Sequence, residues 1–200
     1  DSRIGYSFIY PGCGYGGSCF PKDVKALIRT SREVDFKPTL LEAVEDRNEN
    51  QKKVLFNKVV KRFGADLSGL KIGIWGLSFK PGTDDMREAS SIVLMQNLIK
   101  AGAAITAFDP VAMEQAKKEL PLEWFQSGQL TLCDNQYDVA ENVQAVILVT
   151  EWKTFRQPDF NRMVRIMDTP VIFDGRNQYD PEEVKEAGFE YHGIGREIMG

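Results

Sequence analysis

Residues 71–80, with the sequence KIGIWGLSFK, mark the point where the chain begins to alternate strands with helices. The first five, Lys71–Trp75, have the composition of a strand, and Gly76 interrupts the pattern behind them. On the N-terminal side, residues 64–71 contain glycine, aspartate and serine, which break regular structure. We therefore predict a domain boundary between residues 67 and 68.

The same alternation continues to the C-terminal end of the sequence. Apolar runs predict further strands at 104–108, 130–133, 145–150, 170–173 and 189–192. The intervening segments predict helices at 90–101, 113–119, 137–142, 160–167 and 181–187. Such alternation implies right-handed βαβ crossovers and a mostly parallel sheet. The predicted fold class is α/β, with a helical segment (1–67) followed by a Rossmann-like, doubly wound parallel sheet domain (68–200).

The helical segment is expected to hold two helices, each introduced by a proline. Pro21 suits the first turn of a helix over 21–33, and Pro38 precedes a longer single helix over 39–63. The middle of the longer helix, 45–53, is almost wholly polar, whereas both of its ends are apolar. We interpret the middle as solvated surface and the ends as buried, with contact to another subunit as the alternative.

Composition excludes several classes of protein. The chain has 200 residues, 42% hydrophobic and 27% charged, with a net charge of −4, so nothing indicates a nucleic-acid-binding face. No apolar run has the length of a membrane span. The three cysteines, Cys13, Cys19 and Cys133, are too few and too irregular for a disulfide framework, and with a single histidine we expect no metal site and a cytoplasmic location. The chain does not begin with methionine, and we expect it to be part of a longer protein.

A glycine-rich stretch, GCGYGGSCFPKD at residues 12–23, carries the candidate chemistry. Its four glycines let the backbone approach a ligand closely. Cys19 lies where the loop becomes a helix N-terminus, a position that favours a thiolate, although a cysteine considered alone is more often a small buried hydrophobe. Asp23 is one helical turn further on, and Lys22 adds a positive charge. Together these groups predict nucleophilic chemistry on an anionic ligand.

The ends of the predicted strands supply a second set of candidates. Lys80 follows the first strand and Arg176 follows the fifth, so both are expected at the carboxyl edge of the sheet, where they either bind phosphates or are merely solvated. The turn after the first strand lacks the G-x-G-x-x-G pattern and is a poor dinucleotide site. Asp109 ends the second strand and is at least as well explained as a turn or cap residue as a ribose ligand. Arg87 has no evident structural task.

The contiguous run GGSCFPKD, residues 16–23, resembles the active-site loop of the UDP-glucose 6-dehydrogenases. Four further segments, 1–5, 79–91, 149–152 and 173–176, are similar to other parts of that family. The resemblance covers nearly the whole chain but only the C-terminal half of such an enzyme. It implies NAD-dependent oxidation of UDP-glucose to UDP-glucuronate in two hydride transfers, through a thiohemiacetal and then a thioester on a cysteine.

The resemblance also implies roles for individual residues. Cys19 is expected to be the nucleophile, and Asp23 is expected to assist proton transfer and hydrolysis. The UDP-sugar site would comprise Arg3, reaching from a neighbouring subunit, and Tyr10, Pro11, Gly12, Cys13, Gly14, Tyr15, Gly16, Phe79, Lys80 and Arg176. The nicotinamide side would be bordered by Cys19, Phe20, Pro21, Lys22 and Arg87.

NAD would be bound mainly by an N-terminal domain outside these 200 residues, so this chain alone is expected to be inactive. A homodimer or higher homo-oligomer is implied. Two alternatives stay open: a sister enzyme acting on GDP-mannose or a UDP-acetamido sugar, and a non-catalytic nucleotide-binding module.

Overall fold

The computed structural model describes residue 5 and residues 9–196. The helical part contains α1 (Phe20–Glu33), α2 (Thr39–Gln51) and α3 (Val54–Phe63). The strands of the sheet domain are β1 (Lys71–Trp75), β2 (Ala104–Phe108), β3 (Leu130–Leu132), β4 (Ala145–Leu148), β5 (Val171–Asp174) and β6 (Glu190–Gly193). Its helices are α4 (Ser90–Lys100), α5 (Met113–Glu119), α6 (Leu122–Gln126), α7 (Gln136–Ala140), the 3₁₀ turn η1 (Lys153–Phe155), α8 (Phe160–Ile166) and α9 (Pro181–Glu186).

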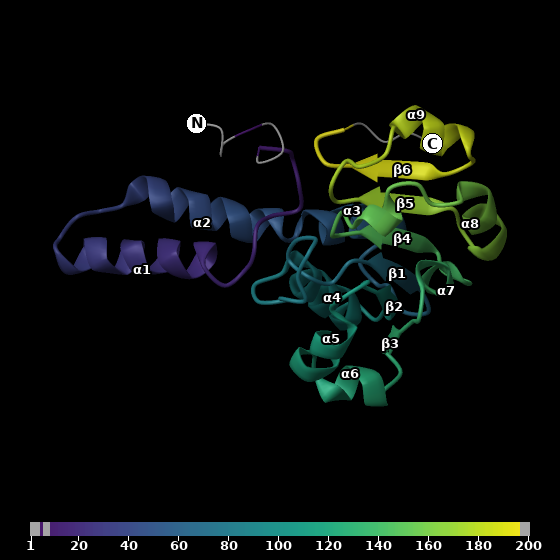
Figure 1. The fold of residues 1–200 in the computed structure, drawn as a ribbon, viewed down its shortest axis with the longest axis horizontal. Helices are drawn as coiled ribbons and strands as arrows, with labels where there is room; N and C mark the ends of the chain where they lie inside the picture. The colour runs from purple at the N-terminus through teal and green to yellow at the C-terminus, as the bar shows by residue number, and fades with distance from the viewer. Residues whose placement is uncertain (1–4, 6–8, 197–200) are drawn as a thin grey trace.

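The six strands form one sheet in the order β3-β2-β1-β4-β5-β6, and every neighbouring pair is parallel (Figure 1). This is the doubly wound order in which the chain grows outward from β1 in both directions. The α/β fold class and the parallel sheet predicted from the sequence are therefore confirmed. The sequence did not predict α6 or η1, which are among the shortest helices of the described chain.

Two apolar cores cover the two faces of the sheet. In β1, Ile72 and Ile74 join the core formed with α3, α4 and α5, while Trp75 joins the core formed with α7, α8 and α9. β4 divides its side chains in the same way, with Ile147 on the first face and Val146 on the second. A central strand buried on both faces is apolar throughout, which is why these strands were recognisable as apolar runs.

The single helix predicted over 39–63 is wrong, because the structure has two helices with a turn at Lys52 and Lys53. The amide of Lys52 still bonds to the carbonyl of Asn48 at 2.9 Å, but that of Lys53 bonds to the carbonyl of Asn50 at 3.2 Å. This tighter, three-residue pattern ends α2 and allows α3 to start in a new direction.

The interpretation of the polar segment 45–53 as solvated surface holds for Asp46, Arg47, Glu49, Asn50 and Lys53, which are exposed, but it is wrong for two other residues. Asn48 and Lys52 are buried, with relative exposures of 4% and 2%, whereas Leu40 in the apolar first turn of α2 is 77% exposed. Asn48 and Lys52 are covered because they bond to the glycine loop and to the sheet domain, respectively, as described below. Burial of the apolar N-terminal end was therefore predicted wrongly, while α3 at the other end does bury Leu55 and Val59.

α1 and α2 form a hairpin that projects away from the sheet domain (Figure 1). Pro21 and Val24 are the buried residues of α1, and Asn48 is that of α2. α3, in contrast, packs into the sheet core, where Phe63 lies 6.4 Å from Phe173 between ring centroids. The predicted boundary between residues 67 and 68 stays a prediction, with α3 on its N-terminal side already attached to the sheet.

Candidate functional site

The glycine loop, residues 12–18, presses against the loop that precedes α4. A Cβ on Gly16 would overlap the carbonyl oxygen of Glu88, so only glycine fits this contact. Next to it, the amide of Gly17 donates to the carbonyl of Arg87 at 2.8 Å. The backbone of the loop is thus fixed directly to the sheet domain immediately before α1 begins.

Two more glycines mark contacts with residues that follow β1 and β5. A Cβ on Gly17, whose φ of +97° also favours glycine, would stand 2.8 Å from the ring of Phe79, and the ammonium of Lys80 lies 5.3 Å from the centroid of the same ring. A Cβ on Gly12 would stand 2.8 Å from Nη1 of Arg176. The structure therefore brings Phe79 and Arg176, predicted from the strand ends, against the glycine loop.

α2 holds the other side of the loop through residues that sequence reasoning missed. The Asn48 side chain accepts from the amide of Tyr15 at 2.8 Å and donates to its carbonyl at 3.2 Å. Gln51 donates to the carbonyl of Gly12 at 2.6 Å. Both residues lie in the polar segment that was interpreted as solvated, and the signal that could have found them is the amide side chains at i and i+3 of one helix face.

Cys19 is the N-cap of α1 and is exposed, as the glycine-loop pattern predicts for a helix N-terminus. Its carbonyl accepts from the amide of Asp23 at 2.8 Å, which places the two residues one turn apart. The nearest polar side-chain partner of the sulfur is the Ser18 hydroxyl at 3.6 Å. Asp23 forms an exposed ion pair with Lys22 at 3.6 Å. The geometry offers an accessible sulfur at the positive end of a helix dipole.

The backbone of Arg87 meets the glycine loop at Gly17, two residues before Cys19. Its guanidinium makes a two-pronged contact with Asp85, at 2.9 and 2.8 Å, and this bond is the main cause that raises the pKa of Arg87. Phe20 is 55% exposed beside Cys19 and packs edge-on against Tyr15, with centroids 4.7 Å apart. An exposed aromatic ring therefore directly follows the cysteine, while the Arg87 guanidinium is held by Asp85.

Arg176 is held from behind by the ends of β4 and β5. Its Nε donates to the carbonyl of Val149 at 2.6 Å and lies 3.1 Å from Oε2 of Glu151, while its amide donates to Asp174 at 2.9 Å. Because Nε is used on that side, the Nη groups face Gly12 and the cavity described below. Burial raises the pKa of the Asp174 carboxyl, although four hydrogen bonds to it act in the opposite direction.

The remaining candidate residues occupy different surroundings. Cys13 is fully buried, its thiol 3.8 Å from the carbonyl of Val149, and burial raises the pKa of that thiol, so only its backbone is left to meet a ligand. The Tyr10 hydroxyl donates to the carbonyl of Asn177 at 3.2 Å, and Pro11 is exposed. Arg3 lies outside the described residues.

A cavity of about 490 Å³ opens between the glycine loop, α2 and Arg176. It is lined by Tyr10, Gly12, Gly14, Tyr15, Ala43, Val44, Arg47, Asn48, Gln51 and Arg176. Phe79, Lys80, Cys19 and Arg87 are not among these lining residues. The candidate residues therefore form two groups, one around the cavity and one around the sulfur, joined by the short stretch Gly14–Ser18.

The crevice at the switch point between β1 and β4, where open sheets usually bind dinucleotides, is filled by the protein itself. Oδ2 of Asp109 accepts from the amides of Leu77 and Ser78 at 2.7 and 3.1 Å, and from Nε1 of Trp152 at 2.9 Å. Its other oxygen caps the first turn before α5. The interpretation of Asp109 as a cap residue is confirmed, and its carboxylate takes the amides that a pyrophosphate would need.

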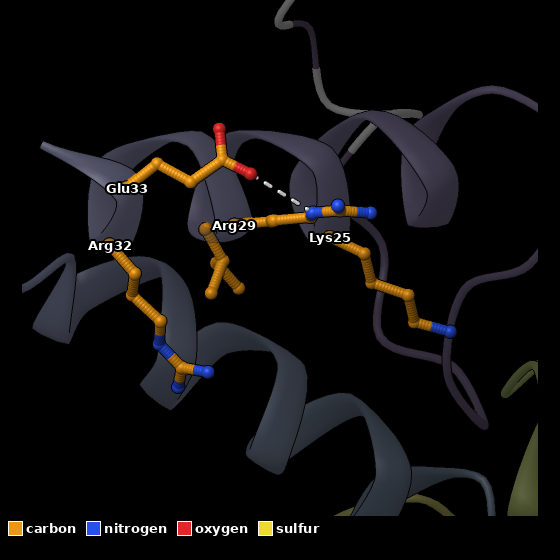
Figure 2. A pocket seen from close by; sticks show the side chains of 5 residues that line it. Lys25, Arg29, Arg32 and Glu33 are labelled. Carbon is orange, nitrogen blue, oxygen red and sulfur yellow. Dashed lines mark hydrogen bonds and ion pairs between the residues drawn. The ribbon is translucent and has the colours of Figure 1, made fainter.

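A second cavity, of about 400 Å³, lies on α1 away from these residues (Figure 2). It is lined by Lys25, Ile28, Arg29, Arg32 and Glu33. Each cation already has a carboxylate partner: Glu88 for Lys25, Glu33 for Arg29 and Glu42 for Arg32. We assign no ligand to this cavity.

Two kinds of feature are absent from the described part of the chain. Over those residues, no group of three or more His, Cys, Asp or Glu side chains is arranged to hold a metal ion. Within the same residues, no helix is both long and apolar enough to cross a membrane.

Comparison with known proteins identifies the family. Residues 73–181 match the UDP binding domain of the UDP-glucose/GDP-mannose dehydrogenase family, and residues 1–50 match the central domain of the same family. The chain therefore belongs to the UDP-glucose/GDP-mannose dehydrogenase family.

Individual relatives agree with this assignment. A UDP-glucose 6-dehydrogenase of Pseudomonas aeruginosa is 49% identical over 200 residues, which is 100% of this chain and 44% of the relative. A UDP-glucose dehydrogenase structure from Pyrobaculum islandicum has a TM-score of 0.79 at 32% identity. That match covers 96% of this chain and 40% of the Pyrobaculum islandicum chain. An NDP-N-acetyl-D-galactosaminuronic acid dehydrogenase structure from Methanosarcina mazei has a TM-score of 0.79 at 25% identity. That match covers 94% of this chain and 40% of the Methanosarcina mazei chain. The chain spans less than half the length of these relatives.

Proposed function

We propose that this chain is the cysteine-bearing and UDP-binding part of an NAD-dependent UDP-glucose 6-dehydrogenase. The observation that carries the proposal is the position of Cys19: it is exposed, it begins α1, and its loop is bonded to the UDP binding domain through Gly17 and Arg87. The 49% identity to a UDP-glucose 6-dehydrogenase favours that substrate over other nucleotide sugars.

The proposed sugar-nucleotide site combines the glycine loop with the strand ends. Arg176 and Lys80 would bind phosphate or sugar oxygens, since a guanidinium and an ammonium both suit anionic oxygens. The backbone of 10–16 would approach the ligand closely, and Phe79 would pack beside it. Arg3 is proposed to come from a neighbouring subunit, which makes the functional unit a homodimer or a larger homo-oligomer.

In the proposed reaction Cys19 acts as the nucleophile. After the first oxidation turns the C6 alcohol into an aldehyde, the sulfur adds to the carbonyl carbon and the oxygen takes a proton, giving a thiohemiacetal. The second oxidation leaves a thioester. Water then attacks the acyl carbon, the C–S bond breaks, and the carboxylate leaves while the thiol is restored. Asp23 would orient that water and move its proton.

NAD⁺, when bound, would supply the hydride acceptor for both oxidations. The turn after β1 does not fit it, because Asp109 already occupies the amides of Leu77 and Ser78. The exposed ring of Phe20 and the cation of Lys22, which follow Cys19 in the chain, and Arg87, whose carbonyl holds Gly17, fit a border to the nicotinamide side. NAD⁺ would therefore be bound mainly by a domain outside these residues. This chain alone would then not oxidise UDP-glucose.

The nucleotide assignment is tested by calorimetry on this chain. We expect UDP to bind more tightly than GDP, and Lys80→Ala to weaken UDP binding about tenfold or more, because a lost charge-assisted hydrogen bond costs roughly 1.5–3 kcal/mol. Lys118→Ala, on the exposed face of α5, is the matched control and should bind UDP like the wild type. Equal affinities for UDP and GDP would contradict the nucleotide assignment, and equal UDP affinities for the wild type and Lys80→Ala would remove Lys80 from the site.

A sister activity remains the second candidate. It is supported by the likeness to the Methanosarcina mazei NDP-N-acetyl-D-galactosaminuronic acid dehydrogenase, which has the same fold and is named for an acetamido sugar acid. Tight UDP binding combined with oxidation of a UDP-acetamido sugar instead of UDP-glucose, measured on the complete enzyme, would favour that candidate.

A further inference from the structure

Lys52, in the turn between α2 and α3, is a buried lysine with a side chain only 2% exposed. Lysines are almost never fully buried unless they are paired. Its ammonium lies 2.9 Å from Oε2 of Glu88 and 3.5 Å from Oε1 of Glu49. Because Glu88 belongs to the loop before α4, the Lys52–Glu88 pair joins the helical segment to the sheet domain.

Glu88 connects three structural parts at once. Its other carboxylate oxygen accepts from Lys25 of α1 at 3.0 Å, and its carbonyl oxygen fills the space beside Gly16. Its φ of +55° is a left-handed conformation that is uncommon for a residue other than glycine. Figure 2 shows the Lys25 side chain extending away from the pair formed by Arg29 and Glu33.

The hydrogen bonds from Lys52 and Lys25 lower the pKa of the Glu88 carboxyl, in that order of size. The carboxylate is therefore ionised at neutral pH and keeps both partners. This arrangement ties the start of α1, the glycine loop and the α2–α3 turn to one residue of the sheet domain.

Stability alone does not explain a buried lysine in this place. Removing an ammonium from water is expensive, and a buried ion pair often stabilises a protein no better than an apolar side chain of similar size. A methionine at position 52 would fill much the same volume. What an apolar side chain cannot do is fix the direction in which the backbone of Glu88 faces Gly16 and Gly17.

We propose that the Lys52–Glu88 pair is a positioning device that sets the glycine loop, and with it Cys19, at the correct place on the sheet domain. The carbonyl of Glu88 faces Gly16, and the neighbouring carbonyl of Arg87 accepts a hydrogen bond from the Gly17 amide. Helix α1 starts at Phe20, three residues after Gly17. That this position matters for catalysis rests on the proposed role of Cys19, whereas the position of the loop itself is inferred from the contacts alone.

Hydrogen exchange on this chain tests the device. In Lys52→Met we expect the amide of Gly17 to exchange at least tenfold faster, while the amides of β1 and β4 keep the protection seen in the wild type. Lys52→Arg, which preserves the charge, should keep the exchange rate of the Gly17 amide close to that of the wild type. Lys53→Met is the matched control, because Lys53 is the exposed neighbour in the same turn.

Alkylation of Cys19 by iodoacetamide is the second measurement. Because the Cys19 sulfur is already exposed, a more mobile loop would not make it more accessible to iodoacetamide. We expect Lys52→Met to slow the reaction several-fold, because a frayed first turn of α1 no longer places the sulfur at the positive end of an ordered helix dipole. Lys52→Arg should again restore the rate.

Three results would overturn the proposal. The first is equal acceleration of exchange at Gly17 and in the sheet, which would mean a loss of stability only. The second is no change at Gly17, and the third is an unchanged alkylation rate. If Lys52→Met does not fold, the same two measurements on Glu88→Gln, which removes the other charge of the pair, test the proposal. All readings are taken without substrate, so failure here leaves the UDP-binding test of the proposed function independent.

Discussion

At the scale of single residues, the glycine loop is shaped by what its neighbours leave free. Gly12 meets a side chain, Arg176, whose end can move, whereas Gly16 meets the backbone of Glu88, which cannot move without displacing its own contacts. Gly128 offers a contrast, since its φ is +74° but nothing lies within 4 Å of an added Cβ. Two glycines can thus be required for different reasons, one for space and the other for conformation.

Gly16→Ala should lose stability and disturb Cys19 together. Forcing a methyl group against backbone costs about 1–3 kcal/mol in typical packed sites. Gly128→Ala, the control, should lose roughly 1–2 kcal/mol through backbone strain alone. Urea unfolding measures both losses, and iodoacetamide labelling should slow at Cys19 only in Gly16→Ala. An unchanged Cys19 rate in Gly16→Ala would show that the contact with Glu88 does not control the loop.

At the scale of elements, the α1–α2 hairpin and the sheet are stabilised very differently. α4 buries six residues against the sheet, whereas α1 and α2 bury three between them. Leu27, Val34, Phe36 and Leu40 leave the hairpin with an apolar surface, each more than half exposed. A segment with few buried contacts is expected to open locally before the whole domain unfolds.

Native-state hydrogen exchange should resolve this difference. Amides of α1 and α2 are expected to exchange through local opening, at a lower free energy than amides of β1 and β4, which should require global unfolding. Measurements at two protein concentrations add a test of the proposed dimer, because a second copy covering the apolar hairpin would raise its protection with concentration. Hairpin amides that open only with the global free energy at low concentration would contradict the expectation.

At the scale of the whole molecule, α3 fastens the helical segment to the edge of the sheet. Nε of Arg62 in α3 donates to both carboxylate oxygens of Glu190 in β6, at 2.8 and 2.7 Å, and Glu190 lies 2.7 Å from His192. The His192 ring stacks on Phe173 with centroids 4.5 Å apart. Burial lowers the pKa of His192, with Glu190 acting in the opposite direction and the cations of Lys58 and Arg62 adding to the decrease.

This histidine should make the stability of the protein depend on pH. A pKa that is lower in the folded state than its usual 6.5 means that the unfolded chain binds the proton more readily, so the free energy of unfolding falls as pH drops below about 6.5. We expect the urea midpoint to decrease between pH 7.5 and pH 5.5. His192→Gln should lower the midpoint at every pH but abolish most of this slope, and the same slope in both proteins would contradict the assignment. The chain has one histidine, which makes the comparison specific.

Local patterns in the sequence were enough to predict the six strands, most of the helices and the position of the cysteine. Helix α1, strands β1 and β2 and helix α5 fall within one residue of their predicted ends, because apolar periodicity and proline or glycine punctuation are local signals. β3 ends one residue earlier than predicted, which leaves Cys133 half-buried just beyond it. Cys19 was placed correctly at a helix N-terminus for the same local reasons.

The residues that hold the glycine loop beside that cysteine depend instead on contacts between distant parts of the chain. Asn48 bonds to Tyr15 across 33 positions, and Lys52 pairs with Glu88 across 36, so no spacing in the sequence connects them. A polar run on a helix has the same pattern whether water or a polar loop covers it. The difference depends on where the glycine loop returns against α2 and the sheet, and that is fixed by packing between distant segments.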